Sequence, residues 1–190
     1  MQRRWLKKRV VCVCLLSVFV YLIVRTRTHD VMFEVVIPNS KPADIWEFVA
    51  DFSNLKKIYP NIIDFNILSE GGNYDHWHYS ARYQEFLLYL PYIRYFIDGH
   101  FNVKPAGGGT YIIQSTHNTC FLYGLFCLFT EAEFRFEPVG TNTRCVKKIK
   151  YQCPIASTLV CRDEVMNQQH AVLSNLQKHF TPPVMLSKSM

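Results

Sequence analysis

The feature that most constrains this chain is its C-terminal run, residues 159–180, with the sequence LVCRDEVMNQQHAVLSNLQKHF. Its apolar residues recur at helical spacing and form one stripe, which a helix about 33 Å long would carry along one side. The stripe consists of Val165, Met166, Val172, Leu173, Leu176 and Phe180. Nearly all of the segment between residues 30 and 151 has the pattern of strands. We therefore expect the helix to bury its stripe in the concave face of a curved antiparallel sheet.

The N-terminal 28 residues differ from the rest in charge. They hold seven of the 21 basic residues and no acidic one, so the remaining chain contains 14 basic and 15 acidic residues. A nearly neutral domain lacks the basic surface that nucleic acids require, and we exclude nucleic acid as a partner. Val10–Val24 is uncharged and flanked by basic residues. We predict that residues 1–28 are a membrane anchor with its span at about residues 10–24.

Two alternatives to this membrane assignment concern processing and location. A cleaved signal peptide would need small residues after Val24, where Arg25 and Arg27 stand instead. The excess of basic residues before the span favours a single-pass protein of the endoplasmic reticulum or secretory pathway, with the domain in the lumen or outside. The outer mitochondrial membrane is the other location considered. It is favoured by the odd number of domain cysteines, which does not form a complete disulfide framework. These cysteines are Cys120, Cys127, Cys145, Cys153 and Cys161.

A family resemblance rests on the run VVIPNSKPADIWEFVADFSNLKKIYPNI. In it a strand ends at Pro38, a helix containing Trp46 follows, and a second short helix ends at Pro60. This order resembles the opening of the START-like (SRPBCC) superfamily, which includes polyketide cyclase/dehydrase-type and lipid-transport proteins. The resemblance extends from about Val31 to Phe180. It implies an α+β helix-grip fold, with residues 29–180 as the START-like domain and 181–190 as a loose tail.

The resemblance also implies a cavity between the helix and the sheet. Strict alternation, as in residues 74–86 and 144–153, places aromatic side chains on the face toward the helix. These aromatic residues either line a cavity for an apolar ligand or fill the core, because both environments use the same residue types. The cavity candidates are Trp77, Tyr79, Tyr83, Tyr95, Phe101, Phe134, Phe136, Tyr151, Met166, Gln169 and Leu173.

Residues 120–129, CFLYGLFCLF, are the most apolar stretch of the domain. Ten uncharged residues suit a fully buried strand, or a loop that gates the cavity and touches a membrane. START-like proteins often gate their pocket with a loop between strands. The candidates for gating and membrane contact are Cys120, Phe121, Leu122, Tyr123, Leu125, Phe126 and Phe129.

The polar residues of the domain indicate no metal, cofactor or catalytic site. His76 and His78 share a polar strand face without a third ligand, and no C-x-x-C spacing occurs, so we expect no metal and no cofactor. The cluster of Lys147, Lys148 and Lys150 is typical of a solvated face. Because the inward faces show few ionisable groups apart from tyrosines, we assign no catalytic residue.

These observations predict a membrane-tethered domain that binds, and transfers, a lipid or other hydrophobic small molecule by burying its apolar surface. One alternative is a cyclase- or dehydratase-like enzyme that uses the same cavity. Another is a ligand-free adaptor that binds a protein partner through residues 120–129.

Overall fold

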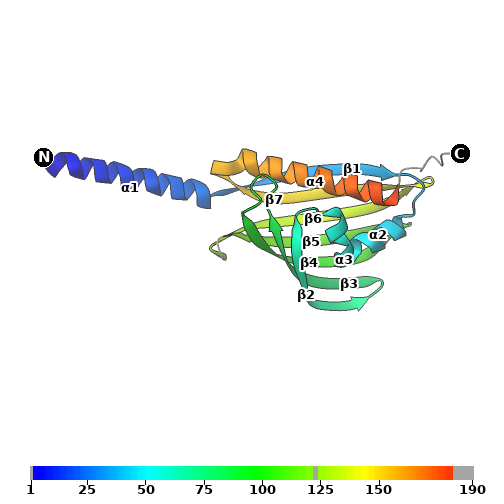
Figure 1. The fold of residues 1–190 in the computed structure, drawn as a ribbon. Coiled ribbons are helices and arrows are strands. Elements are labelled where there is room, and N and C mark those ends of the chain that lie inside the picture. The colour runs from blue at the N-terminus through cyan, green and yellow to red at the C-terminus, as the bar shows by residue number, and fades with distance from the viewer. Residues whose placement is uncertain (1, 122–123, 182–190) are drawn as a thin grey trace, which may run out of the picture.

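The computed structural model describes residues 2–121 and 124–181, and its ribbon is shown in Figure 1. Seven antiparallel strands form one sheet in the order β1-β7-β6-β5-β4-β3-β2. The strands are β1 (Thr26–Ile37), β2 (Ile62–Asn73), β3 (His76–Phe86), β4 (Arg94–Gly107), β5 (Thr110–Phe121), β6 (Phe126–Val139) and β7 (Asn142–Pro154). The helices are α1 (Gln2–Val24), α2 (Pro42–Ala50), α3 (Phe52–Ile58), the 3-10 turn η2 (Ile155–Ser157) and α4 (Thr158–Phe180).

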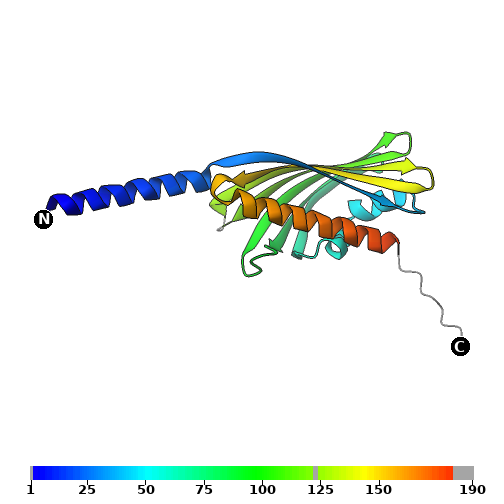
Figure 2. The same ribbon diagram turned by 90° about the horizontal axis from the view of Figure 1, so that it is seen from above.

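The long helix α4 lies along the concave side of the sheet, and α2 and α3 cover the same side near its C-terminal end (Figures 1 and 2). Val172, Leu173 and Leu176 of α4 are buried in a core shared with the inward side chains of the strands. The apolar stripe of the sequence thus contacts the curved sheet. The helix-grip part of the predicted fold is confirmed.

The order of the strands in the sheet places the first and the last strand of the chain side by side. β2 to β7 follow one another as antiparallel neighbours, whereas β1 pairs with β7, the last strand of the chain. In that pairing Phe33 lies opposite Lys147 and Val31 opposite Ile149. The pair formed by β1 and β7, which are far apart in the sequence, lies beside α4. Helix α4 follows β7 after the short turn η2.

The end of the fold near α2 is closed by aromatic packing. Trp46 is buried, and its indole Nε1 donates a hydrogen bond to the carbonyl oxygen of Ile112 at 3.4 Å. The Trp46 ring lies 4.7 Å from the ring of Tyr111 and 5.6 Å from that of Tyr74, between ring centroids. This packing fixes α2 over β5 and leaves the opposite end of the sheet as the open one.

Several strands are longer than their sequence patterns indicate. β1 begins at Thr26, before the apolar run that starts at Val31, and β2 continues through the glycines at 71 and 72, a residue type that strands disfavour. β5 runs to Phe121 because it pairs with β6 along its whole length. Pairing partners supply backbone hydrogen bonds to residues whose own side chains do not favour a strand.

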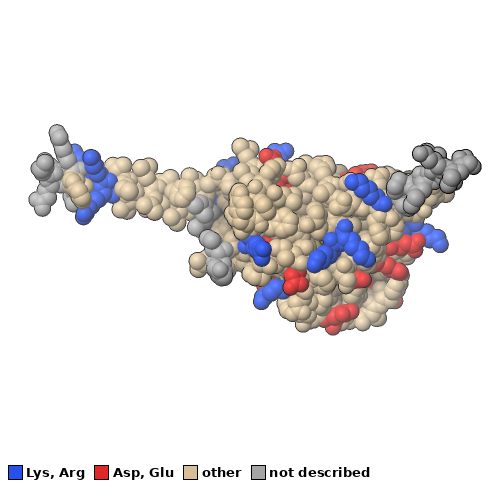
Figure 3. Space-filling model, in the orientation of Figure 1, with Lys and Arg blue, Asp and Glu red and all other residues tan. Residues whose placement is uncertain are grey.

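The predicted membrane anchor is wrong. Residues 2–24 form α1, a 23-residue helix that projects from the domain (Figures 1 and 2). Within the described residues, no helix is both long enough and apolar enough to cross a membrane. The physical reason is that the uncharged part of α1 has only fifteen residues and that five basic residues precede it in the sequence. Blue basic side chains near the free end of α1 are visible in Figure 3. A single-pass location in the endoplasmic reticulum or outer mitochondrial membrane is therefore not supported.

Candidate ligand-binding cavity

A cavity of about 430 Å³ lies between α4, α3 and the concave face of the sheet. Its volume falls within the range of small-molecule sites in proteins. Most of its wall is apolar, and the aliphatic and phenylalanine side chains that form it come from five strands and from α2, α3 and α4. They include Val49, Phe52, Leu55, Ile62, Ile97, Phe101, Ile113, Leu128, Phe134, Ile149 and Val165. The aromatic and aliphatic residues of the concave face thus surround an internal space.

The cavity reaches the surface at the end of the sheet away from α2. Its wall there includes Tyr89 and Leu90 from the loop between β3 and β4, Phe121 and Phe126 from the β5–β6 hairpin, and Val160 from α4. Of these, Tyr89, Leu90 and Val160 are exposed to solvent. We call this opening the mouth.

The rim of the mouth is apolar as well. Leu125 at the tip of the β5–β6 hairpin is 87% exposed, Tyr92 in the β3–β4 loop is 82% exposed, and Leu159 at the start of α4 is 79% exposed. Exposed apolar side chains from three elements around one opening distinguish this end from an ordinary polar surface.

The β3–β4 loop is held against α4 by polar contacts. The carboxylate of Glu164 accepts hydrogen bonds from the backbone N–H groups of Leu88 and Tyr89. The amide of Asn167 donates a hydrogen bond to the hydroxyl of Tyr89. Because the loop forms one wall of the mouth, these contacts join that wall to α4.

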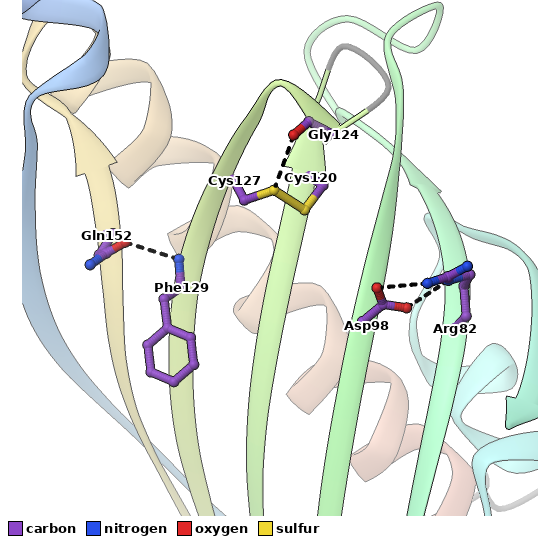
Figure 4. The surroundings of a disulfide bond; sticks show 7 residues. All are labelled: Arg82, Asp98, Cys120, Gly124, Cys127, Phe129 and Gln152. Carbon is purple, nitrogen blue, oxygen red and sulfur yellow. Dashed lines mark hydrogen bonds and ion pairs between the residues drawn. A yellow bond between two sulfur atoms is a disulfide. The ribbon is translucent and has the colours of Figure 1, made fainter. Parts of the chain in front are cut away.

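Two disulfide bonds strengthen the same end. Cys120–Cys127 joins the two strands of the β5–β6 hairpin at its tip, beside Gly124 (Figure 4). Cys153–Cys161 connects the end of β7 to the first turn of α4. Cys145 is buried and unpaired within the part of the chain that the structure describes. Four of the five domain cysteines therefore form two bridges, and Cys145 is the odd one.

The cavity wall contains a buried carboxyl group. Glu85 Oε2 accepts hydrogen bonds from the side chains of Asn61 at 2.7 Å, Tyr95 at 3.0 Å and Gln168 at 3.1 Å. Burial raises the pKa of Glu85 to about 7 because it disfavours the charged form, and the three hydrogen bonds and the nearby Lys147 only partly oppose this rise. Glu85 therefore changes its protonation state near neutral pH.

A buried lysine faces the same cavity. Lys147 is only 6% exposed, and its Nζ donates hydrogen bonds to the hydroxyl of Tyr59 and, at 2.7 Å, to Oε1 of Gln169. Its Nζ also lies 5.1 Å from the ring centroid of Tyr59 and 5.6 Å from that of Phe134, a favourable arrangement for a cation. All three neighbours are uncharged side chains, so the ammonium is held by dipoles and ring faces.

The third ionisable group of the wall is His117. Its Nε2 is hydrogen-bonded to Ser115 Oγ at 2.8 Å and its Nδ1 to the Tyr83 hydroxyl at 3.0 Å. Burial lowers the pKa of His117 to about 3, and the charge of Lys147 adds to this effect. The imidazole is therefore neutral at physiological pH. Gly99 makes room for it, because a Cβ there would lie 3.1 Å from the ring.

The cavity residues predicted from the sequence separate into two groups. Six line the cavity: Tyr83, Tyr95, Phe101, Phe134, Tyr151 and Gln169. Five are not among the lining residues: Trp77, Tyr79, Phe136, Met166 and Leu173. Tyr79, Phe136 and Leu173 are buried in the core, and Trp77 and Met166 pack against it.

The gate candidates lie at the tip of the β5–β6 hairpin. Phe121 and Phe126 line the mouth, whereas Leu125 and Phe129 are exposed. Cys120 takes part in the hairpin disulfide. Two further candidates, Leu122 and Tyr123, lie outside the described residues. The segment is therefore neither one buried strand nor a free loop, since its ends pair as strands and its tip is exposed.

The charged residues of the cavity were missed in the sequence. Lys147 was grouped with Lys148 and Lys150 as a solvated face, and this is wrong because Lys147 points inward. Residues two apart in a strand lie on the same face, so Lys147 lies on the face of Ile149 and Tyr151. This alternation was the signal available in the sequence. In the same way, Glu85 shares its face with Tyr83. The expectation that the inward faces carry almost no ionisable groups is therefore also wrong.

Comparison with known proteins finds no family model and no curated protein that matches this sequence. Solved structures do match. A START superfamily protein from Mycobacterium smegmatis is 14% identical, with a TM-score of 0.55, and the match covers 80% of this chain and 97% of that one. The lipid transfer and protein localization domain of human StarD13 (DLC2) is 12% identical, with a TM-score of 0.59 and coverage of 80% and 77%. The hypothetical protein jhp0584 from Helicobacter pylori is also 12% identical, with a TM-score of 0.59 and coverage of 80% and 88%.

These likenesses concern the fold, because the sequence identities are low. Together with the strand order and the position of α4, they establish that the chain has the START-like helix-grip fold. The resemblance seen in residues 35–62 and in the C-terminal helix is confirmed at that level.

Proposed function

We propose that this protein binds a hydrophobic small molecule or lipid in the cavity beneath α4 and exchanges it through the mouth. The observation that carries the proposal is the cavity itself, because it is mostly apolar and continuous with an apolar rim. Each Å² of apolar ligand surface removed from water contributes about 25 cal/mol, so such a site needs few polar contacts. The fold shared with the START superfamily protein and the StarD13 domain supports the same function.

We also propose that the rim contacts a membrane surface while the ligand passes. A bilayer is where water-insoluble ligands reside, and the exposed side chains of Tyr92, Leu125 and Leu159 are of the type that enters its interfacial region. Ligand exchange then requires the β3–β4 loop to release Glu164. This contact is peripheral and does not involve α1.

Native mass spectrometry of the full chain, purified from cells, tests ligand binding when it is combined with lipid extraction of the same sample. The wild-type protein should carry a stoichiometric hydrophobic adduct. Ala132 lies on β6 and lines the cavity, so Ala132→Phe should fill the space and abolish the adduct. Glu131→Gln, on the opposite face of the same strand, is the matched control and should keep it. A wild-type protein that stays free of adduct after incubation with mixed-lipid vesicles would contradict the proposal.

One observation favours a second candidate, an enzyme that uses the same cavity. The three donors to Glu85 all bind Oε2, so Oε1 has no hydrogen-bond donor among the described residues. A carboxyl group with a pKa near 7 can give and take a proton at neutral pH, as dehydration and cyclisation reactions require. Incubating the extracted ligand with wild type and with Glu85→Gln tests this. A change in ligand mass with wild type alone supports an enzyme, and ligand recovered unchanged from both argues against it.

A further inference from the structure

Lys147 places a positive charge in the cavity wall, and the binding of a purely apolar molecule would not require that charge. The ammonium of Lys147 is removed from water, and burying an unpaired charge is unfavourable unless other groups compensate for it. None of the ion pairs found among the described residues includes Lys147. An ammonium has three N–H donors, and the structure provides acceptors for two of them, Tyr59 and Gln169.

None of the other ionisable groups that line the cavity forms an ion pair with Lys147 among the described residues. His117 is neutral, and a neutral or positive imidazole cannot pair with an ammonium. The Glu85 carboxyl accepts the hydrogen bonds of Asn61, Tyr95 and Gln168 at Oε2 and makes no hydrogen bond to Lys147. Glu164 at the mouth accepts its hydrogen bonds from the backbone of the β3–β4 loop. The third N–H donor of Lys147 therefore remains available to an anionic group of a ligand.

We propose that the ligand of this cavity is an amphipathic monocarboxylate, whose carboxylate binds the Lys147 ammonium while its hydrocarbon part fills the apolar remainder. This inference rests on the proposed function and specifies its ligand class. A single ammonium is a point charge, and it can bind one anionic group such as a carboxylate. No arginine lines the cavity in the part of the chain that the structure describes. The cavity volume of about 430 Å³ also suits a single-chain carboxylate better than a two-chain phospholipid.

Calorimetric titration of the full chain at pH 7.4 with dodecanoic acid and with dodecan-1-ol tests the inference. The two probes share the hydrocarbon chain and differ in the anionic end. Wild type should bind the acid at least about tenfold more tightly than the alcohol, because hydrogen bonds to ionised groups are about twice as strong as neutral ones. Lys147→Met should lose this preference while still binding the alcohol, which also shows that the variant is folded.

Two further variants separate charge from position. Lys148→Met changes the next residue of β7, which points to the other face of the sheet, and it should keep the preference for the acid. Lys147→Arg keeps the charge and should retain most of the preference.

Equal affinity of wild type for acid and alcohol would overturn the carboxylate inference and leave the proposed function intact. Binding of neither probe would overturn both. If Lys147→Met kept the preference for the acid, Lys147 would not be the anchor and the inference would be rejected.

Discussion

Charged side chains have different surroundings on the concave and the convex face of the sheet. On the convex face, Arg82 and Asp98 pair across β3 and β4 with a nitrogen–oxygen distance of 2.6 Å (Figure 4), and Arg144 pairs with Glu34 at 2.8 Å. On the concave face, Lys147 has only uncharged partners. Several charged groups outside therefore form ion pairs, whereas Lys147 inside forms none among the described residues.

The pKa shifts follow this division. Hydrogen bonds from Arg82 lower the pKa of Asp98, so this outer carboxyl keeps its charge. Burial raises the pKa of Glu85 and lowers that of His117, so both inner groups tend toward their neutral forms. The outer face therefore keeps its charged groups ionised in solvent, whereas the inner face favours neutral forms, as the proposed apolar ligand site would require. Lys147, the charged exception on the inner face, is the group most informative about that occupant.

The strongest test of the comparison removes an aromatic ring from the inner face. Phe136 is fully buried and lies 4.5 Å from Phe134 between ring centroids. Phe136→Ala should lower the free energy of unfolding by about 3–5 kcal/mol, through lost burial and the cavity that remains. Met32→Ala, at an exposed side chain of β1, should change it by less than about 0.5 kcal/mol. Urea denaturation measures both, and similar losses would contradict the contrast between the faces.

A second test uses pH. The pKa of Glu85 is about 7 in the folded state against 4.5 for the free side chain, so the folded protein holds this proton more tightly than the unfolded chain does. Its stabilising effect is complete below pH 4.5 and is lost as the pH rises toward 7, a change on the order of 3 kcal/mol. Relative to Glu85→Gln, wild type should therefore become less stable across this interval.

The outer face provides the control for this pH experiment. Because the pKa of Asp98 is lowered in the folded state, its contribution is present above the ordinary range of an aspartate and is lost as the pH falls. Wild type compared with Asp98→Asn should thus lose stability toward acid, the reverse of the Glu85 profile. Denaturation curves from pH 3 to 8 measure both, and parallel profiles would contradict the assignment.

The two disulfide bonds allow a smaller, matched comparison. They close loops of nearly equal length, with sequence separations of 7 and 8, so their effects on the unfolded chain are similar. Replacing Cys153 and Cys161 by alanine should cost about 2–3 kcal/mol, and it should also free the start of α4 from β7. Replacing Cys120 and Cys127 should cost no more than this. Thermal unfolding measures the two losses, and a larger loss at the hairpin tip would contradict the expected order.

The smallest effect is expected from the outer ion pair. Arg82 and Asp98 are solvent-exposed, so water and salt screen their attraction. A double-mutant cycle with Arg82→Ala and Asp98→Ala should give a coupling energy close to the limit of detection, and it should vanish in high salt. A strong, salt-independent coupling would show that the convex face also stabilises the fold through charge.

Much of the fold was predictable because its signals are local. The helix was predicted at residues 159–180 and lies at Thr158–Phe180, since one amphipathic stripe is sufficient to define it. The alternation of residues 74–86 predicted β3 and its inward aromatic face. The extension of β1 to Thr26 was not predictable, because it depends on pairing with β7, more than a hundred residues away. The lengths of strands are decided by partners rather than by propensity.

The cavity was only partly accessible to such reasoning. Aromatic residues that line the space and those that fill the core share the same face of the same strands, as Tyr83 and Tyr79 do on β3. Which of them faces empty volume depends on how α4 lies over the sheet. Lys147 is the exception, because the alternation of β7 already indicated that it faces inward. The neighbouring Lys148 and Lys150 made it look like part of a solvated cluster.

The amino-acid sequence by itself determined the elements, the face that each strand turns inward, and the helix-grip order in which they follow one another. These properties depend on spacing along the chain, and spacing is visible in one dimension. Only the tertiary structure decided that Glu85, His117 and Lys147 surround one cavity, and that four cysteines form two bridges near its mouth. Contacts of this kind join residues far apart in sequence, and they exist only once the sheet has curved around α4.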